Sequence, residues 1–341
     1  MRVLITGVHG FVGSNLVEAL KSEHTIYGLD IISPDKDGVV KTFSWEDLDN
    51  VGSGFLDEPC GKAERKVKGS STSEAAKSSA SHEIPEVDAI IHLAGKAHDT
   101  KNKSAADVYF KVNTGLTQKI FDWFLKQPKC KKFVFFSTAK AAADRVEGLL
   151  TEDVVPTPVG PYGESKIKAE EYILSKMPSD KRVYVFRPCM IHGPGNKGNL
   201  NLLYNVVKKG IPYPLGAFEN ERTFTSIGNI CFAVEGVLSK DVPSGIYNMG
   251  DDEALSTNEL IEEICKSLGK KAQIWKLPKG LMNGVAKIGD ILHLPLNSER
   301  LRKLTENYIS SNDKIKKALG VEKMPVDART GLQTTLRSFK G

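Results

Sequence analysis

The stretch MRVLITGVHGFVGSNLVEALKSEHTIYGLD, residues 1–30, decides the fold. Residues 2–6 are mostly apolar and predict a buried strand, and residues 25–29 predict a second one. Between them, apolar side chains recur at helical spacing over residues 11–21, which predicts a helix. A strand, a helix and a strand in this order form a β-α-β unit, which is typical of a parallel sheet covered by helices.

The same alternation continues to about residue 190. Three further apolar runs predict buried strands, and two longer stretches between them predict helices; the strands are residues 88–93, 133–136 and 182–186, and the helices are residues 104–126 and 161–177. Because crossovers between parallel strands are right-handed, an open doubly wound α/β sheet is the expected topology.

Beyond residue 190 the loops become rich in Gly, Pro and Asn. We therefore predict two domains, residues 1–190 and 191–341, with residues 224–249 returning to the first domain. Helices are expected in the second domain at residues 257–268, 281–292, 312–319 and 328–339. We interpret the helix over residues 281–292 as a core or dimer helix, with a membrane-facing apolar stripe as the alternative.

Composition excludes several classes of protein. The net charge of +5 comes from 47 basic and 42 acidic residues spread along the 341, which argues against a nucleic-acid partner. No window approaches the roughly 18 apolar residues of a membrane-spanning helix. The five cysteines lie far apart without a C-x-x-C pair, so neither a disulfide framework nor a metal site is expected. These observations favour a cytoplasmic protein without stable membrane insertion.

Residues 51–83 break the pattern on both sides. Six of the thirteen residues from Gly69 to Ser81 are serine, and apolar periodicity is lacking. Such a segment buries too little apolar surface to offset the entropy of ordering. We predict a flexible surface insertion, either native or engineered.

The glycine spacing after the first strand predicts a dinucleotide site. Gly7 permits a sharp turn, Gly10 lets backbone amides approach a pyrophosphate, and Gly13 lets the helix pack closely on the strand. The helix N-terminus then offers N–H groups to the phosphates. Asp30 ends the second strand, where a carboxylate binds a ribose diol and repels a 2′-phosphate. NAD is therefore favoured over NADP, although an Asp that caps a strand end would occupy the same position.

A second set of polar residues predicts the chemistry. Tyr162 and Lys166 stand at i and i+4 on one helix face, where the ammonium is expected to lower the pKa of the phenol and prepare it as a general base. Ser137 and Thr138 follow a strand at the sheet edge where ligands bind. A chance Y-x-x-x-K pattern and a turn cap are the alternatives for these residues.

Together these motifs resemble the extended short-chain dehydrogenase/reductase family, and within it the nucleotide-sugar epimerases and dehydratases. The motifs are T-G-x-x-G-x-x-G at residues 6–13, H-x-A-G at 92–95, Asn113 in V-N-T-G, Y-x-x-x-K at 162–166, and R-P followed by H-G-P-G at 187–195. The resemblance covers nearly the whole chain except residues 51–83. It implies a Rossmann-type doubly wound parallel sheet with a smaller α/β substrate-binding domain.

The resemblance also implies roles for individual positions. The catalytic residues would be Tyr162, Lys166, Thr138, Ser137 and Asn113. The NAD-binding residues would be Gly7, Gly10, Phe11, Val12, Gly13, Asp30, Leu93, Ala94, Gly95, Tyr162, Lys166 and Pro188. The substrate-binding residues would be Thr138, Asn199, Leu200 and Arg222, with a second phosphate ligand from Arg300 or Arg302.

One departure from the family pattern narrows the reaction. Ala139 and Lys140 follow Thr138 where dehydratases of the family carry an Asp-Glu pair, so dehydration is not expected. The leading hypothesis is a homodimeric NAD-dependent 4-epimerase of a nucleotide-diphosphate sugar, a UDP-hexose or UDP-N-acetylhexosamine. A 4-ketosugar reductase of polysaccharide-precursor synthesis that uses NAD(P)H is the alternative. A non-catalytic NAD-binding regulator stays open as a third class.

Overall fold

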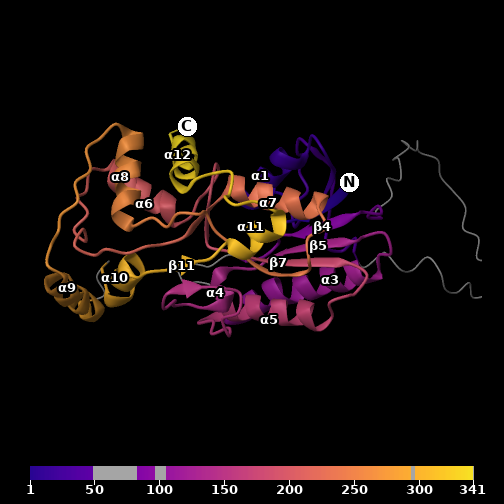
Figure 1. Ribbon diagram of the computed structural model, residues 1–341, viewed down its shortest axis with the longest axis horizontal. Helices are drawn as coiled ribbons and strands as arrows, with labels where there is room; N and C mark the ends of the chain where they lie inside the picture. Colours follow the sequence, from indigo (N-terminus) through magenta and orange to yellow (C-terminus); the bar gives the residue numbers. More distant parts are fainter. Residues whose placement is uncertain (49–82, 97–104, 293–295, 341) are drawn as a thin grey trace, which may run out of the picture.

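The computed structural model describes residues 1–48, 83–96, 105–292 and 296–340. The predicted insertion therefore lies outside the described residues except for Glu83. The centre of the molecule is a seven-stranded sheet in the order β10-β7-β5-β4-β1-β2-β3 (Figure 1). Every neighbouring pair in it is parallel. Its strands are β1 (Arg2–Thr6), β2 (Thr25–Leu29), β3 (Val39–Phe43), β4 (Ala89–His92), β5 (Lys132–Phe136), β7 (Arg182–Pro188) and β10 (Gly245–Met249).

Alternate residues of each central strand point to opposite faces, and each face has its own helices. Val134 and Phe136 of β5 pack with α1 (Phe11–Leu20), α7 (Ile227–Ser239) and α11 (Asp313–Leu319). Phe133 and Phe135 pack on the other face with α3 (Leu116–Lys126) and α5 (Pro161–Ser175). Figure 1 shows these two helical layers above and below the sheet. The predicted doubly wound α/β fold is confirmed.

The single helix predicted for residues 104–126 is wrong in detail. The described part begins with α2 (Ala106–Tyr109), continues as a π-helical segment η1 (Phe110–Gly115) and ends as α3. The side-chain amide of Asn113, in η1, hydrogen-bonds the backbone N–H and C=O of Lys96. The hydroxyl of Thr117, in α3, donates to the backbone carbonyl of Asn113 at 2.6 Å. Such π-helical turns inside α-helices are frequent at functional sites.

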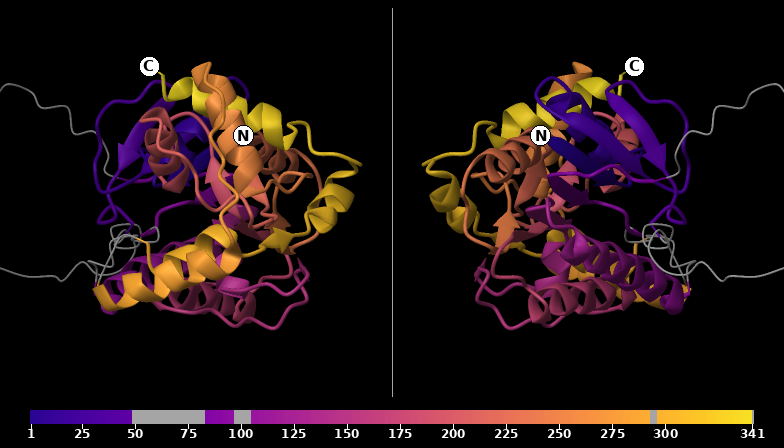
Figure 2. Two further views of the ribbon diagram at one scale, coloured as in Figure 1. Left: turned by 90° about the vertical axis from the view of Figure 1, so that its left-hand side faces the viewer. Right: turned by 90° about the vertical axis from the view of Figure 1, so that its right-hand side faces the viewer.

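The rest of the chain packs against the carboxyl end of the sheet. It contains α4 (Ala139–Ala142), α6 (Asn199–Lys208), α8 (Thr257–Leu268), α9 (Lys279–Leu292), α10 (Ser298–Thr305) and α12 (Ala328–Ser338). Two small parallel sheets join β8 (Met190–His192) to β9 (Phe224–Ser226) and β6 (Leu149–Leu150) to β11 (Ile309–Ser310). Figure 1 shows α8 and α9 at the end of the molecule away from the central sheet, and Figure 2 shows that end facing the viewer.

Two long-range features concern residues 224–249, which we predicted to return to the first domain. The strand β10 pairs with β7, so residues 245–249 are part of the central sheet. The helix α7 covers the same sheet. The division into residues 1–190 and 191–341 stays a prediction. In the described parts of the chain, every helix is too short or too polar to cross a membrane.

Candidate active site

The glycine turn between β1 and α1 has the backbone that a close approach requires. Gly7 has a φ of +69°, a conformation that favours glycine, and its amide donates to the Leu29 carbonyl at 2.8 Å. A Cβ on Gly13 would lie 2.4 Å from the Gly7 carbonyl oxygen. Gly10 is the N-cap of α1, so the N–H groups of the first helical turn point out of this turn. The geometry fits a pyrophosphate.

Asp30 faces this turn from the end of β2. Its carboxylate accepts hydrogen bonds from the His9 amide at 3.0 Å and from the Ile31 amide at 2.8 Å. Phe11, the first residue of α1, packs close to Gly193, since a Cβ on Gly193 would stand 3.5 Å from the Phe11 ring. Asp30 therefore both caps its strand and fixes the turn, and its predicted role toward a ribose remains a prediction.

A chain of buried polar groups runs beneath the turn. The Thr6 hydroxyl accepts from the Leu93 and Ala94 amides and contacts His92 Nδ1 at 2.7 Å. His92 Nε2 reaches the Thr117 hydroxyl at 2.9 Å. Burial holds the pKa of His92 well below its usual value, and the nearby Lys166 lowers that pKa further. His92 is thus a neutral structural link, with its proton assigned to Nε2 because the Thr117 hydroxyl already donates to Asn113.

Tyr162, Lys166 and Thr138 meet at the carboxyl end of β5. The Thr138 hydroxyl hydrogen-bonds the Tyr162 phenol. The Lys166 ammonium is buried, donates to the Phe136 carbonyl at 2.7 Å and lies 4.8 Å from the centre of the Phe135 ring. A Cβ on Gly95 would stand 3.2 Å from the same nitrogen, which brings the end of β4 into this group.

The pKa expected for Tyr162 is corrected by this geometry. Burial raises the pKa of Tyr162 above its ordinary value, and the hydrogen bond from Thr138 opposes that rise. The Lys166 ammonium is directed to the Phe136 carbonyl. Burial also lowers the pKa of Lys166 to about 8, with the Glu170 carboxylate partly offsetting it. Desolvation disfavours the charged forms of both groups. The nearby Lys166 therefore does not by itself bring the pKa of Tyr162 below its ordinary value.

Asn113 and Ser137 have different surroundings. Asn113 accepts from the Lys96 amide at 2.7 Å and donates to the Ser165 hydroxyl at 3.0 Å, so it ties η1 to α5 next to Tyr162. The Ser137 hydroxyl donates to Glu170, which is paired with Arg187 inside the molecule. Sequence reasoning missed this ion pair, because Glu170 lies on α5 and Arg187 lies on β7, 17 residues later.

The residues expected on the substrate side lie around β9 and α6. Asn199 is exposed at the first turn of α6, whereas the Leu200 side chain is buried in the core, so only the backbone of Leu200 is left for its predicted contact with the substrate. Pro188 is buried at the carboxyl end of β7. The Arg222 guanidinium donates to the Lys303 carbonyl at 2.8 Å, and burial lowers its pKa.

The two candidates for a second phosphate ligand both lie on α10. Arg302 binds Glu306 at 2.6 Å and lies 3.7 Å from Asp144, which also holds Lys140 at 2.9 Å. The Arg300 amide donates to the side chain of Asn297 at 2.9 Å, so Asn297 caps the helix. Because Arg302 already faces two carboxylates, a phosphate there would have to displace them.

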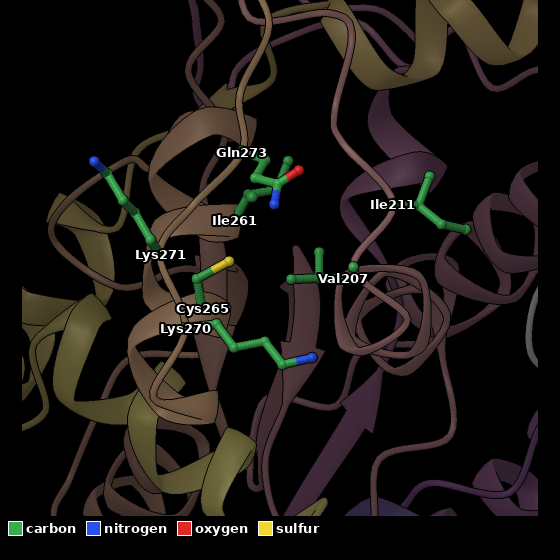
Figure 3. Close-up of a pocket in the computed structure, with 8 residues that line it drawn as sticks. Val207, Ile211, Ile261, Cys265, Lys270, Lys271 and Gln273 are labelled. Atoms are coloured by element: carbon green, nitrogen blue, oxygen red, sulfur yellow. The ribbon is translucent and has the colours of Figure 1, made fainter.

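A separate cavity of about 330 Å³ opens between the end of α6 and α8 (Figure 3). Its walls include Val207, Ile211, Ile261, Cys265 and two lysines, Lys270 and Lys271. In the described part of the chain, the predicted site residues do not line this cavity. The candidate site is therefore the group of residues at the carboxyl ends of β1, β2, β4, β5 and β7.

Such a grouping at the carboxyl edge of a doubly wound sheet is typical of Rossmann-type dinucleotide-dependent enzymes. Residues 3–250 match the model of the NAD dependent epimerase/dehydratase family. The chain belongs to that family, which confirms the predictions of an enzyme, of its family and of NAD as its cofactor.

Named relatives agree with this membership. The chain is 29% identical over 291 residues to the UDP-glucose 4-epimerase of Vibrio cholerae, across 81% of this chain and 78% of the relative. It is 26% identical over 293 residues to the N-acetyl-alpha-D-glucosaminyl-diphospho-ditrans,octacis-undecaprenol 4-epimerase of Escherichia coli O157:H7, across 83% and 77%. The solved UDP-glucuronic acid 4-epimerase of Bacillus cereus in complex with NAD has the same fold, with a TM-score of 0.69, 19% identity and coverage of 100% and 99%.

Proposed function

We propose that the chain epimerises a nucleotide-diphosphate sugar at C4, with a UDP-hexose or UDP-N-acetylhexosamine as substrate, through a 4-keto intermediate. The hydrogen-bonded Thr138 and Tyr162 beside the buried Lys166 carry this proposal. The 4-epimerases of Vibrio cholerae and Escherichia coli O157:H7, to which the chain is similar, support C4 as the position of the reaction. Ala139 and Lys140, in place of the acids of dehydratases, favour epimerisation over loss of water.

The residues at the glycine turn fit NAD. Gly7, Gly10 and Gly13 leave a cradle that a Cβ would fill, and α1 presents its N-terminus to it. In the proposed complex the pyrophosphate binds there, Asp30 binds a ribose diol, and Lys166 binds the nicotinamide ribose. When bound, NAD accepts a hydride from the sugar carbon and returns it.

Tyr162 moves the proton in both halves of the proposed reaction. Its phenolate oxygen takes the proton of the C4 hydroxyl while the C4–H bond breaks and its electron pair leaves with the hydrogen as hydride. It returns that proton to the keto oxygen when the hydride is added to the other face of C4. The Thr138 hydroxyl stabilises the phenolate by donating to it. Because burial raises the pKa of Tyr162, a protonated Lys166 is needed close by to make the base effective.

Arg222 is the proposed ligand of the diphosphate. Its planar guanidinium can bind two phosphate oxygens at once. It lies near Cys189 and Tyr308, and thus close to the carboxyl end of β7. We expect Arg222→Met to raise KM for the nucleotide sugar more than it lowers kcat, because a diphosphate contact is made in ground state and transition state alike.

The direct test incubates the purified chain with NAD and a panel of UDP-sugars, plus N-acetylglucosaminyl-diphospho-undecaprenol, and detects C4 epimers by NMR. We expect an epimer from at least one sugar, and a loss of about 10²- to 10⁴-fold in Tyr162→Phe. Tyr172→Phe is the matched control, since this tyrosine lies on the same helix but binds Asp122 at 2.7 Å. No epimer from any sugar, or equal rates in Tyr162→Phe and the wild type, would contradict the proposal.

The alternative functions give different results in the same assay. A 4-ketosugar reductase of polysaccharide-precursor synthesis would consume NADH or NADPH in stoichiometric amounts. A regulator would bind NAD and turn over nothing. The homodimer and the cytoplasmic location remain predictions, which analytical ultracentrifugation and cell fractionation can check.

A further inference from the structure

Among the residues that the structure describes, an apolar stripe on α9 (Lys279–Leu292) is exposed. Leu281, Val285, Ile288 and Leu292 follow one another at spacings of four, three and four, so they lie on one helix face. Their exposed fractions are 55%, 39%, 53% and 62%. The buried residues of this helix are Met282, Ala286 and Gly289. Met282 and Ala286 pack with Leu215 and Leu301. The fold therefore covers one part of the apolar sector of α9 and exposes the rest.

The same segment is strongly basic. Residues 270–292 contain five lysines and one acid, Asp290. All five lysines are exposed. Lys279 and Lys287 lie on α9 and Lys276 precedes it, whereas Lys270 and Lys271 line the cavity between α6 and α8. Trp275, in the loop before α9, is 54% exposed. Figures 1 and 2 place α9 at the end of the molecule away from the sheet.

We propose that residues 270–292 bind the surface of an anionic lipid bilayer. An amphipathic helix with apolar side chains on one face and lysines beside it lies in the plane of the headgroups, with the apolar side chains entering the acyl boundary. Exposed lysines are attracted to anionic headgroups, and a tryptophan fits the interface because its ring is apolar with one polar N–H. With 14 residues, α9 is long enough to lie on a membrane.

Charge selects this occupant over a second copy of the chain. Two copies joined through this face would bring Lys279 and Lys287 of both α9 helices together, and like charges across an interface are destabilising. An anionic bilayer offers the opposite charge together with an apolar layer. The proposal does not depend on the reaction catalysed, since the proposed catalytic residues lie outside residues 270–292.

Co-sedimentation of the full chain with vesicles tests the proposal. One set of vesicles is phosphatidylcholine alone, and the other contains phosphatidylglycerol as well. Leu281→Ser combined with Ile288→Ser removes apolar contacts, and Lys276→Glu combined with Lys287→Glu reverses two charges. The control combines Val155→Ser with Val159→Ser, two exposed valines outside the segment. Thermal unfolding and NAD content verify that each variant is folded.

We expect the wild type and the valine control to sediment with the phosphatidylglycerol vesicles, and added salt to release them. Both test variants should bind about tenfold more weakly. The proposal is overturned if the wild type stays in the supernatant, or if both variants bind as the wild type does. It is also overturned if the wild type self-associates through this face, measured by ultracentrifugation, without binding either kind of vesicle.

Discussion

Glu170 and Arg187 form an ion pair of 2.6 Å in which both side chains are almost fully buried. Glu170 belongs to α5, one helical turn after Lys166, and Arg187 belongs to β7. The Arg187 Nε also donates to both carboxylate oxygens at 3.1 Å. The pair therefore fastens the helix that carries Tyr162 to the sheet beneath it.

Removing one partner of this pair should be strongly destabilising. We expect Glu170→Gln or Arg187→Met to lower the free energy of unfolding by about 3–5 kcal/mol, because each leaves a buried charge without its counter-ion. Combining Glu170→Leu with Arg187→Met should recover most of the loss. Urea unfolding of the single and double variants measures these differences, and single losses below about 1 kcal/mol would show that the pair is unimportant.

Lys166 should make stability depend on pH in a defined window. Its pKa is about 8 in the folded protein and 10.5 by the ordinary value, so the unfolded chain binds more protons between these values. The free energy of unfolding of the wild type, relative to Lys166→Met, should therefore rise as the pH rises from about 8 to about 10.5. Urea unfolding across this range is the measurement. A difference that stays constant would mean that the buried amine keeps its ordinary pKa.

Thr138 should set the pKa of Tyr162. Its hydroxyl stabilises the phenolate, so Thr138→Ala should raise the pKa of Tyr162 further and move the rise of activity to higher pH. Thr138→Ser keeps the hydroxyl and should leave the profile in place. The ultraviolet titration of tyrosinate, compared between each variant and its Tyr162→Phe counterpart, reports the pKa directly. Identical profiles for the Ala and Ser variants would count against the role of this hydrogen bond.

Gly13 should tolerate no side chain. A Cβ there would stand 2.4 Å from the Gly7 oxygen and 2.9 Å from Val8, so Gly13→Ala should push α1 from β1, lower the thermal midpoint and weaken retention of NAD. Gly284→Ala is the matched helical control, because a Cβ there meets nothing within 4 Å. The control should stabilise the chain by up to about 1 kcal/mol. Equal behaviour of the two variants would refute the packing role of Gly13.

Residues 51–83 should be dispensable. Leu48 lies just before this segment and Ile84 follows it, and both side chains are buried in the same core cluster. We expect a chain with residues 51–83 deleted to keep its thermal midpoint and its bound NAD. Calorimetry and the mass of nucleotide released on denaturation measure both quantities. Loss of either would show that the segment belongs to the functional structure.

The sequence by itself determined the local elements that place the site. Runs of apolar residues predicted β1, β2, β4, β5 and most of β7, and helical spacing predicted α1 and α5. The glycine turn and the i, i+4 relation of Tyr162 and Lys166 were equally visible, since each depends on a few consecutive residues. The strand β3 was not predicted because it lies at the edge of the sheet, where only Phe43 of its five residues is buried. Its sequence therefore has neither a continuous apolar run nor a clear apolar and polar alternation.

Only the tertiary structure decided what those residues experience. The pairing of β10 with β7 and the ion pair of Glu170 with Arg187 each join residues of different elements. His92 is neutral because the residues packed around it exclude water. The sign of the pKa shift of Tyr162 was predicted wrongly for the same reason. Desolvation depends on everything packed around a group, whereas a sequence pattern reports only neighbours along the chain. The exposed part of the apolar sector of α9 was likewise decided by which helices pack against it.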